Sequence, residues 1–254
     1  MMSGGAIYPS LKDRTVLVTG GGGGIGESIV RHFVAQGSKV GFLDIDRAAS
    51  QRLVSELAPI GTVHFEPCDL RDIAALRAAI AAVRERFGPV TVLVNNAGHD
   101  QRHRLEDVTP DYWDERMQIN LRHQFFAAQA VVPDMKEAGG GAIINLGSIT
   151  WMIGQGGMPA YSAAKSAVLG LTRSLARDLG PFNIRVCSVM PGWIMTERQI
   201  DLWLTADGEA ELMARQCLKR KLYPEDIARP VLFLASEEAG AITNQAYVID
   251  GGWV

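Results

Sequence analysis

Several features of secreted, membrane and nucleic-acid-binding proteins are missing from this sequence. Its 254 residues include only three cysteines, Cys68, Cys187 and Cys217, with no C-x-x-C pair, which argues against a disulfide framework and a cysteine-based zinc site. The formal net charge is −3 at pH 7, so the chain has no basic excess with which to neutralise phosphates or an anionic membrane. We expect neither nucleic acid nor a membrane as a partner, and we expect Cys68 and Cys187 to be buried.

Long apolar stretches are also missing. No uninterrupted apolar run approaches the ~20 residues that a membrane-spanning helix needs. The first residues, MMSGGAIYPSLKDR, lack a basic segment followed by an apolar core, as an export signal would have. Hydrophobic residues nonetheless make up 47% of the chain and charged residues 21%, which is the balance of an ordinary packed protein. We therefore expect a protein of the reducing cytoplasm.

What the chain does have is a regular alternation of short apolar runs and longer helical patterns. Apolar residues recur at helical spacing from Ile73 to Phe87, and Gly88 follows as a stop. Apolar strands that alternate with helices predict a parallel sheet covered on both faces, with right-handed crossovers. We predict an α/β fold in a single domain over residues 1–254: a doubly wound seven-stranded parallel sheet with helices on both faces. The predicted strands span residues 15–20, 39–45, 62–69, 90–98, 142–148, 184–192 and 245–250.

The stretch VTGGGGGIGE, residues 18–27, contains six glycines between a predicted strand and a helical pattern. Glycines in this position let backbone N–H groups approach a pyrophosphate at the positive end of a helix, whereas a flexible linker would not join two buried elements. The pattern alone is degenerate. It fits G-x-G-x-x-G through Gly21, Gly23 and Gly26, and G-x-x-x-G-x-G through Gly20, Gly24 and Gly26.

An acidic residue, Asp44, ends the second predicted strand. It lies near the offset of ~20 residues at which a carboxylate meets the adenosine ribose of a dinucleotide. Its charge would repel the 2′-phosphate of NADP. The glycine loop contains no lysine or arginine, and the nearest basic residue after Asp44 is Arg47. We therefore expect NAD as the cofactor. Asp44 could instead cap the next helix, although Asp46 is the better capping candidate.

Tyr161 and Lys165 lie four residues apart in a predicted helix that begins near Pro159, and Ser148 ends the strand before it. A phenol with a pKa near ~10 is a poor base at neutral pH, and an adjacent ammonium lowers that pKa. A decrease of roughly 2 to 3 units requires about 3 to 4 kcal/mol of differential stabilisation. A lone Tyr-x-x-x-Lys is usually a surface pair, so its place after a nucleotide loop is what favours catalysis.

These motifs together resemble the short-chain dehydrogenase/reductase family along nearly the whole chain. TGGGGGIG at 19–26 is similar to the family's glycine loop, NNAG at 95–98 to its fourth-strand motif, and PG at 191–192 with Thr196 to its nicotinamide-side motif. The resemblance implies a Rossmann-like fold and a homotetramer. The dinucleotide-binding residues that it implies are Gly20, Gly24, Ile25, Gly26, Asp44, Asp69, Leu70, Asn96, Ala97, Gly98, Tyr161, Lys165, Pro191, Gly192, Ile194 and Thr196.

The resemblance also implies a mechanism. Tyr161 would remove the proton from a substrate hydroxyl while hydride leaves the same carbon for the nicotinamide. Ser148 would hold the substrate oxygen, Lys165 would lower the pKa of the tyrosine and bind the nicotinamide ribose, and Asn120 would anchor a water that relays the proton. Within the glycine run, Gly21, Gly22 and Gly23 would fill variable positions. Gly24→Val is then expected to damage NAD binding more than Gly22→Ser.

Substrate choice is expected to come from the loops after the fourth, fifth and sixth strands. These loops mix hydrogen-bonding side chains with tryptophans, which suits a polyhydroxylated ligand better than a lipid. The segments AIYPSLKDR, YWDERMQINLRHQFF and QCLKRKLYPEDIARPVLFLAS resemble bacterial aldose 1-dehydrogenases, which implies oxidation of C1 of a pentose such as D-xylose or L-arabinose to a lactone. The candidate substrate contacts are Ser148, Trp151, Gln155, Tyr161, Trp193, Asp100 and Arg102.

Four alternatives stay open, and the first is an NAD-dependent dehydrogenase of another sugar or of a polyol. A dehydrogenase of a sugar acid, such as a 2-keto-3-deoxy sugar acid, needs a cation for the carboxylate, which Arg102 or Arg198 could supply. A fatty-acyl reductase would need a phosphate-binding cation and a longer apolar pocket. A non-catalytic nucleotide-binding protein remains possible on fold grounds alone, but the intact Ser, Asn, Tyr and Lys set argues against it. No metal is expected, since His99 and His103 lie in a predicted loop without H-E-x-x-H.

Overall fold

The computed structural model describes residues 5–254. Residues 1–4 belong to the stretch that lacks an export signal and lie outside the described residues. The described chain contains a seven-stranded parallel sheet, in the order β3-β2-β1-β4-β5-β6-β7, so the predicted sheet is confirmed. Its strands are β1 Thr15–Thr19, β2 Lys39–Asp44, β3 Val63–Pro67, β4 Val92–Asn95, β5 Gly141–Leu146, β6 Ile184–Pro191 and β7 Ala246–Ile249.

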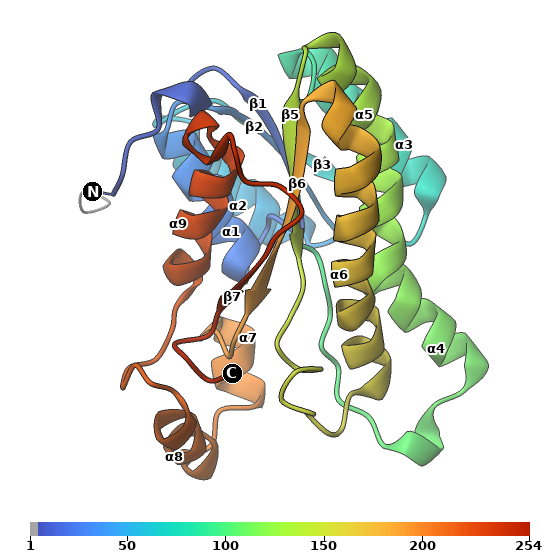
Figure 1. Cartoon of the computed structure of the whole chain (residues 1–254), viewed down its shortest axis with the longest axis vertical. Coiled ribbons are helices and arrows are strands. Elements are labelled where there is room, and N and C mark those ends of the chain that lie inside the picture. Colours follow the sequence, from blue (N-terminus) through green and yellow to red (C-terminus); the bar gives the residue numbers. More distant parts are fainter. Residues whose placement is uncertain (1–4) are drawn as a thin grey trace.

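Helices cover both faces of this sheet (Figure 1). One face packs against α1, α2 and α9, and the other packs against α3, α5 and α6. Alternate residues of β1 serve the two cores: Val16 and Val18 join the first, and Leu17 joins the second. The helices are α1 Gly24–Ala35, α2 Arg47–Leu57, α3 Ile73–Phe87, α4 Pro110–Met117, α5 His123–Glu137, α6 Pro159–Leu179, α7 Glu197–Leu202, α8 Ala206–Arg215 and α9 Pro224–Ala235.

Local sequence signals account for several helix ends. Asp46 caps α2 by accepting a hydrogen bond from the backbone N–H of Ala49, as expected for the better capping candidate. Asp72 caps α3, and Gly88 ends it with φ +87°, a conformation that favours glycine. Pro159 occupies the first turn of α6, where its missing N–H costs nothing. Local signals therefore fix ends of α2, α3 and α6, and α6 carries Tyr161 and Lys165.

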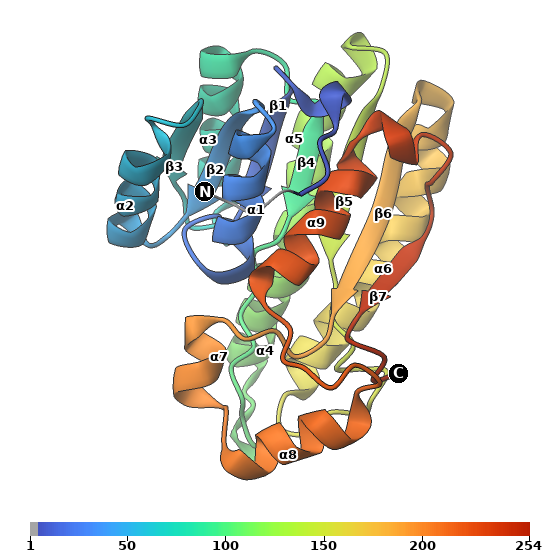
Figure 2. The same ribbon diagram turned by 90° about the vertical axis from the view of Figure 1, so that its left-hand side faces the viewer.

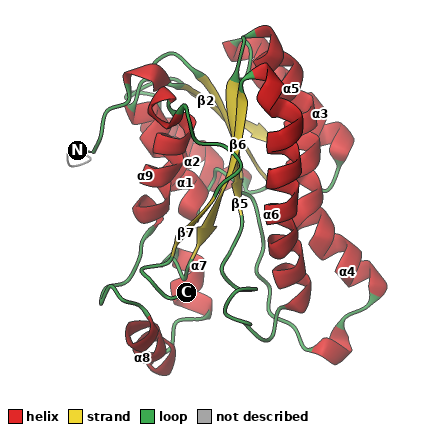
Figure 3. Cartoon of the chain, in the orientation of Figure 1, coloured by secondary structure: helices red, strands yellow, loops and turns green. Residues whose placement is uncertain are grey.

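The strand order reverses between β1 and β4, which are hydrogen-bonded neighbours. Open α/β sheets bind ligands outside the carboxyl ends of their strands at such a reversal. Two further helices, α7 and α8, stand beyond those ends (Figures 2 and 3). The segment that forms them was expected to be a loop. It is helical because Thr196 caps α7 and Thr205 caps α8 through their side-chain oxygens.

Candidate active site

The glycine loop joins β1 to α1 and is held by the chain that follows β4. The Thr19 hydroxyl accepts hydrogen bonds from the backbone N–H groups of Asn96 and Ala97. The amide of Asn96 in turn donates to the carbonyl oxygens of Thr19 and Gly20, at 3.0 and 2.9 Å. Two motifs far apart in sequence therefore build one cradle at the reversal point.

Steric contacts show why the cradle needs glycine. A Cβ atom at Gly26 would lie 1.8 Å from the carbonyl oxygen of Gly20. Gly20 and Gly24 have φ angles of +66° and +55°, in the region that favours glycine. A Cβ at Gly20 would also lie 2.8 Å from Cα of Ala97. All three positions selected by the G-x-x-x-G-x-G spacing are thus restricted.

The three glycines expected to be variable differ from one another. A Cβ at Gly21 would lie 2.7 Å from the Phe42 side chain, and one at Gly22 would lie 2.6 Å from the Ser50 hydroxyl. Only at Gly23 would a Cβ meet nothing within 4 Å, and its φ of −162° is ordinary extended backbone. Gly21 and Gly22 are therefore not free positions, because β2 and α2 pack against them.

Two carboxylates lie near the cradle. Asp44 accepts hydrogen bonds from the backbone N–H groups of Gly22 and Asp46, at 2.8 and 2.9 Å, so it sits at the rim of the glycine loop. Asp69 is paired with Arg71, 2.7 Å away. Hydrogen bonding to that guanidinium lowers the pKa of Asp69 below its usual value.

Asn120 lies in a short π-helical segment, Gln118–Arg122, between α4 and α5. Such segments occur frequently at functional sites. Its buried amide accepts a hydrogen bond from the backbone N–H of His99 at 2.7 Å and donates to the carbonyl of Arg116 at 3.0 Å. A Cβ at Gly98 would lie 3.2 Å from the Asn120 oxygen and 3.0 Å from Nζ of Lys165. Gly98 thus permits close packing of the loop, the lysine and the asparagine.

Tyr161 and Lys165 point from the first turns of α6 toward the end of β5. The Lys165 ammonium donates a hydrogen bond to the carbonyl of Leu146 at 2.8 Å and lies 5.8 Å from the centre of the Tyr161 ring. Ser148 comes two residues after β5, and its side chain lies close enough to the Tyr161 hydroxyl to lower the pKa of the phenol. Strand β5 therefore ends sooner than predicted, but the three side chains lie together.

The electrostatics around Tyr161 differ from the expectation based on Lys165 alone. Burial raises the pKa of Tyr161, the charge of Asp100 raises it further, and the Ser148 side chain acts in the opposite direction. Burial also lowers the pKa of Lys165 to about 8, against an opposing effect of Asp100. Desolvation is therefore the main effect on the phenol, and Lys165 is not among the groups that shift its pKa.

A cavity of about 1470 Å³ connects these groups. Its lining includes every predicted cofactor-binding residue and every predicted substrate contact except Trp151; Asn120 lies behind it. The cavity runs from the cradle, past Ser148 and Tyr161, to the side chains of α7 and α8. Trp151 is placed elsewhere, and its indole nitrogen has no hydrogen-bond partner among residues 5–254.

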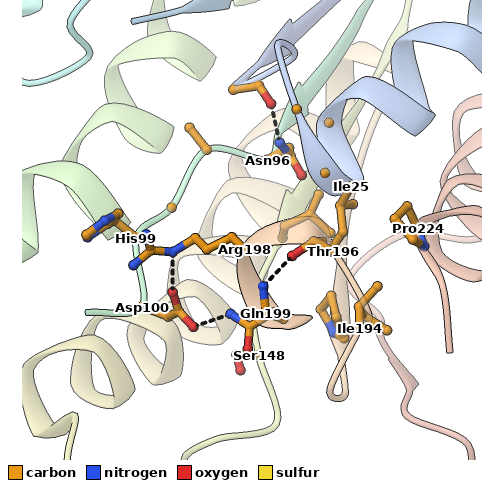
Figure 4. Close-up of a pocket in the computed structure, with 18 of the residues that line it drawn as sticks. Ile25, Asn96, His99, Asp100, Ser148, Ile194, Thr196, Arg198, Gln199 and Pro224 are labelled. Carbon is orange, nitrogen blue, oxygen red and sulfur yellow. Dashed lines mark hydrogen bonds and ion pairs between the residues drawn. The ribbon is translucent and has the colours of Figure 1, made fainter. Parts of the chain in front are cut away.

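A polar network lines the end of the cavity near Tyr161 (Figure 4). The carboxylate of Asp100 accepts hydrogen bonds from Arg198 at 3.3 Å and from Gln199 at 2.6 Å. The side-chain amide oxygen of Gln199 accepts a hydrogen bond from the indole N–H of Trp193 at 2.9 Å. Arg102 lies over the ring of Trp203, 4.4 Å from its centre. Both arginines that could have received a substrate carboxylate already have partners.

Among the lining residues that were not predicted as site residues, His99, Arg116 and Gln199 make polar contacts within the site. Arg116 is 4% exposed and its Nη1 lies 2.8 Å from Nδ1 of His99. A guanidinium only donates, so Nδ1 accepts and the ring proton of neutral His99 is on Nε2. Burial lowers the pKa of His99, and the charges of Arg198 and Arg116 lower it further. Arg116 lies in α4, within a segment that was expected to be a loop, and no sequence pattern singled it out.

No helix within residues 5–254 is long and apolar enough to cross a membrane. Over the same residues, no group of three or more His, Cys, Asp or Glu side chains is arranged to hold a metal ion. Cys68 and Cys187 are buried, as predicted, and Cys217 is exposed.

Comparisons with known proteins agree with this geometry. A family model described as "Enoyl-(Acyl carrier protein) reductase" matches residues 21–254. The chain is 51% identical to the D-xylose 1-dehydrogenase of Caulobacter vibrioides over 98% of both chains. It is 50% identical to the probable galactose dehydrogenase GalD of Rhizobium meliloti over 96% of both chains.

A solved structure is similar in its fold. It is a 7α-hydroxysteroid dehydrogenase in complex with NADH and 7-oxo glycochenodeoxycholic acid, which matches with a TM-score of 0.91 and 30% identity over 96% of both chains. The match of the family model, the two relatives and the fold lead to one conclusion. The chain belongs to the short-chain dehydrogenase/reductase family, an oxidoreductase family that uses NAD(H) or NADP(H).

Proposed function

We propose that this enzyme oxidises C1 of a neutral free sugar to the lactone with NAD, and that the sugar is a pentose such as L-arabinose or D-xylose or an aldose of similar shape. The observation that carries this proposal is the Asp100 network beside Tyr161. It offers a carboxylate, a glutamine and an indole to a hydroxylated ligand. The two relatives at 50 and 51% identity carry the names of a galactose and a D-xylose dehydrogenase.

Tyr161 is the proposed base. It takes the proton of the C1 hydroxyl, while the neighbouring Ser148 hydroxyl, which lowers the pKa of the phenol, holds the sugar oxygen in line with it. Lys165 is fixed by the Leu146 carbonyl and places a positive charge beside the phenol, which favours its ionised form. Asn120 fixes the backbone of His99 from behind and is placed to hold a proton-relaying water.

The residues fit a nicotinamide dinucleotide. The cradle leaves no room for a Cβ at Gly20 or Gly26, and it ends at the first turn of α1, where backbone N–H groups bind phosphate oxygens. When bound, the dinucleotide supplies the hydride acceptor. Lys165 would contact the nicotinamide ribose, and Pro191, Gly192, Ile194 and Thr196 would line its other side.

Asp44 supports NAD over NADP. Its carboxylate is fixed at the rim of the loop by two backbone N–H groups, where it would accept a hydrogen bond from a ribose hydroxyl and repel a phosphate. Arg47 is not among the cavity-lining residues. Arg31, which does line the cavity, is already paired with Glu27 and Glu56.

Oxidation of a sugar acid is the second candidate function. It is less well supported, because a substrate carboxylate would have to displace Asp100 from Arg198 or Trp203 from Arg102. A fatty-acyl reductase fits less well still, since the charged and polar side chains of Asp100, Arg198 and Gln199 line the cavity that contains Tyr161. A non-catalytic binding protein would not need Ser148, Tyr161 and Lys165 within one pocket.

The deciding experiment is a panel of free aldoses and 2-keto-3-deoxy sugar acids, each tested with NAD and with NADP. Formation of the reduced cofactor is followed by its absorbance. We expect the highest kcat/KM with a neutral aldose and NAD. A preference for the sugar acids would support the second candidate, and binding of NAD without turnover of any compound would support the non-catalytic one.

A further inference from the structure

Asp100 and Arg198 form a charged pair on the cavity wall. Asp100 comes from the segment after β4 and Arg198 from α7, and Nε of the arginine lies 3.3 Å from one carboxylate oxygen. The Asp100 side chain is 21% exposed and that of Arg198 is 42% exposed. Both side chains line the cavity that contains Tyr161. A substrate in this cavity would therefore meet a compensated pair of charges and not a free cation.

The orientation of Asp100 is fixed by more than the arginine. Gln199, the next residue of α7, donates its amide N–H to the second carboxylate oxygen at 2.6 Å. The amide cannot turn over freely, because its oxygen accepts the Trp193 indole N–H. Each carboxylate oxygen can accept a further hydrogen bond, so Asp100 can still receive one from a sugar hydroxyl. The pair is thus a built feature of the wall.

We propose that Asp100 acts as an internal anion for Arg198, so that the pocket accepts neutral sugars and rejects sugars that carry a carboxylate. This inference rests on the proposed function. A substrate carboxylate would compete with Asp100 for the guanidinium and would approach a fixed like charge. Discrimination by an unfavourable contact is a common source of specificity.

The negative charge of Asp100 acts on the two titratable groups that we propose for the reaction, Tyr161 and Lys165. It raises the pKa of both Tyr161 and Lys165, in each case as an effect second to burial. Arg102, the other guanidinium of the same segment, lies over Trp203, and Arg116 is held by Glu115 and His99. Loss of the Asp100 charge would therefore release Arg198 in particular.

The test compares sugars that differ only in a carboxylate. The substrates are D-galactose with D-galacturonate and D-glucose with D-glucuronate, and kcat/KM is measured for the original enzyme, Asp100→Asn, Arg198→Met and the double variant. Asparagine keeps an acceptor for Gln199 and removes the charge. We expect the acid-to-neutral ratio of kcat/KM to rise at least about tenfold in Asp100→Asn and to lose most of this gain in the double variant, which lacks the released guanidinium.

A ratio of two substrates on one protein cancels losses in folding or in cofactor binding. Glu106→Gln is the matched control, because Glu106 lies in the same segment, is paired with Arg104 at the surface and is 58% exposed. It removes one negative charge outside the cavity lining, so its ratio should stay at the original value. A ratio that rises equally in Glu106→Gln would overturn the proposal, because net charge would then explain it.

Direct binding separates this inference from the proposed function. Calorimetry with D-galacturonate on the same proteins, each loaded with NADH, measures the effect of the charge without any turnover. A tighter Kd in Asp100→Asn alone would support the internal anion even if no neutral sugar were oxidised, in which case only the proposed function fails. An unchanged Kd together with an unchanged ratio would overturn the internal anion, as would a gain that persists undiminished in the double variant.

Discussion

Tyr161 occupies a place where two physical effects oppose each other. Burial raises the pKa of its phenol and Asp100 adds to this effect, whereas the Ser148 hydroxyl lowers it. A base is most useful when its pKa lies near the working pH, so the buried phenol depends on positive charge from its surroundings. Lys165 is the ammonium placed to provide part of that charge, one helical turn along α6.

Replacing Tyr161 with Phe is expected to lower kcat by at least about a hundredfold, the scale of a missing general base, and to leave NAD binding intact. Turnover of the best neutral sugar and calorimetric binding of NAD measure the two quantities. Tyr247→Phe in β7, outside the cavity lining, is the matched control and should keep full activity. Retained turnover in Tyr161→Phe would contradict the mechanism.

Replacing Asp44 with Ala is expected to reduce the preference for NAD over NADP by at least about tenfold, because a charge that repels the 2′-phosphate is lost. The ratio of kcat/KM for the two cofactors measures it. Asp44→Asn separates charge from hydrogen bonding, since an amide oxygen can still accept from Gly22. An original enzyme that already prefers NADP would contradict the assignment.

The roles of residues within short motifs could largely be predicted from the sequence, because their contacts are made within the motif or with the next element. Glycine at positions 20 and 26 follows from close backbone approach, and the Tyr161 and Lys165 pair follows from helix periodicity. The contacts of Asp100 were not readable. Its partners come from α7, nearly a hundred residues further along. No spacing rule relates the segment after β4 to a helix so distant in the sequence.

At the scale of elements, the glycine loop and α1 act as one unit. The loop enters α1 through Gly23 and Gly24, and Asn96 holds it from the neighbouring strand end. The sequence predicted this unit well because a strand, a glycine run and an amphipathic helix follow one another. The sequence did not distinguish Gly23, which has room for a side chain, from Gly21 and Gly22. The contacts that restrict those two glycines come from Phe42 and Ser50, which lie in other elements.

A matched pair of substitutions tests this unit. Gly26→Ala is expected to weaken NAD binding by more than about tenfold and to destabilise the protein by roughly 1–3 kcal/mol, because its methyl group would overlap the carbonyl of Gly20. Gly23→Ala should leave both quantities nearly unchanged. Calorimetry and thermal unfolding measure them. Equal effects of the two substitutions would refute the steric account, and Gly22→Ser is not the mild change because Ser50 is too close.

Sequence patterns missed the helices α4, α7 and α8 and the π-helical segment at Asn120. Threonine caps for α7 and α8 were present at Thr196 and Thr205. Both helices are short, however, and the segment has no periodic apolar face to distinguish it from a loop. A π-helical turn has no sequence signature of its own, because tertiary packing around Asn120 selects it.

For the whole molecule, the alternation of strands and helices predicted the parallel sheet and the two helical layers. The homotetramer remains a prediction. The buried face of α6 packs within the chain through residues such as Ala164 and Val168, so the apolar pattern of this helix is explained without a partner. Its outer face, which includes the exposed residues Ala167 and Gly170, is small enough for another helix to approach closely.

Light scattering on the purified chain is expected to give four times its mass of 27.5 kDa. Gly170→Arg should then reduce the assembled mass, because a long cation would stand on the outer face of α6. The folded chain itself has room for the side chain, since nothing lies within 4 Å of a Cβ at Gly170, and loss of a helical glycine favours the helix by about 0.8–1 kcal/mol. A tetramer that persists would place the interface elsewhere, and a monomeric original chain would contradict the prediction.

The reversal of strand order between β1 and β4 also bears on how the protein is made. The cradle joins residues 19–26 to residues 95–98, so a chain emerging from the ribosome has only half a cradle until the second segment has been synthesised. Until β4 has been made, β1 is paired with β2 on one side only, and its other edge is unpaired. Unpaired strand edges of this kind favour aggregation. Non-local pairing of this type slows folding. Capacity to bind the dinucleotide should therefore appear only after residues 95–98 have emerged and have closed on the glycine loop.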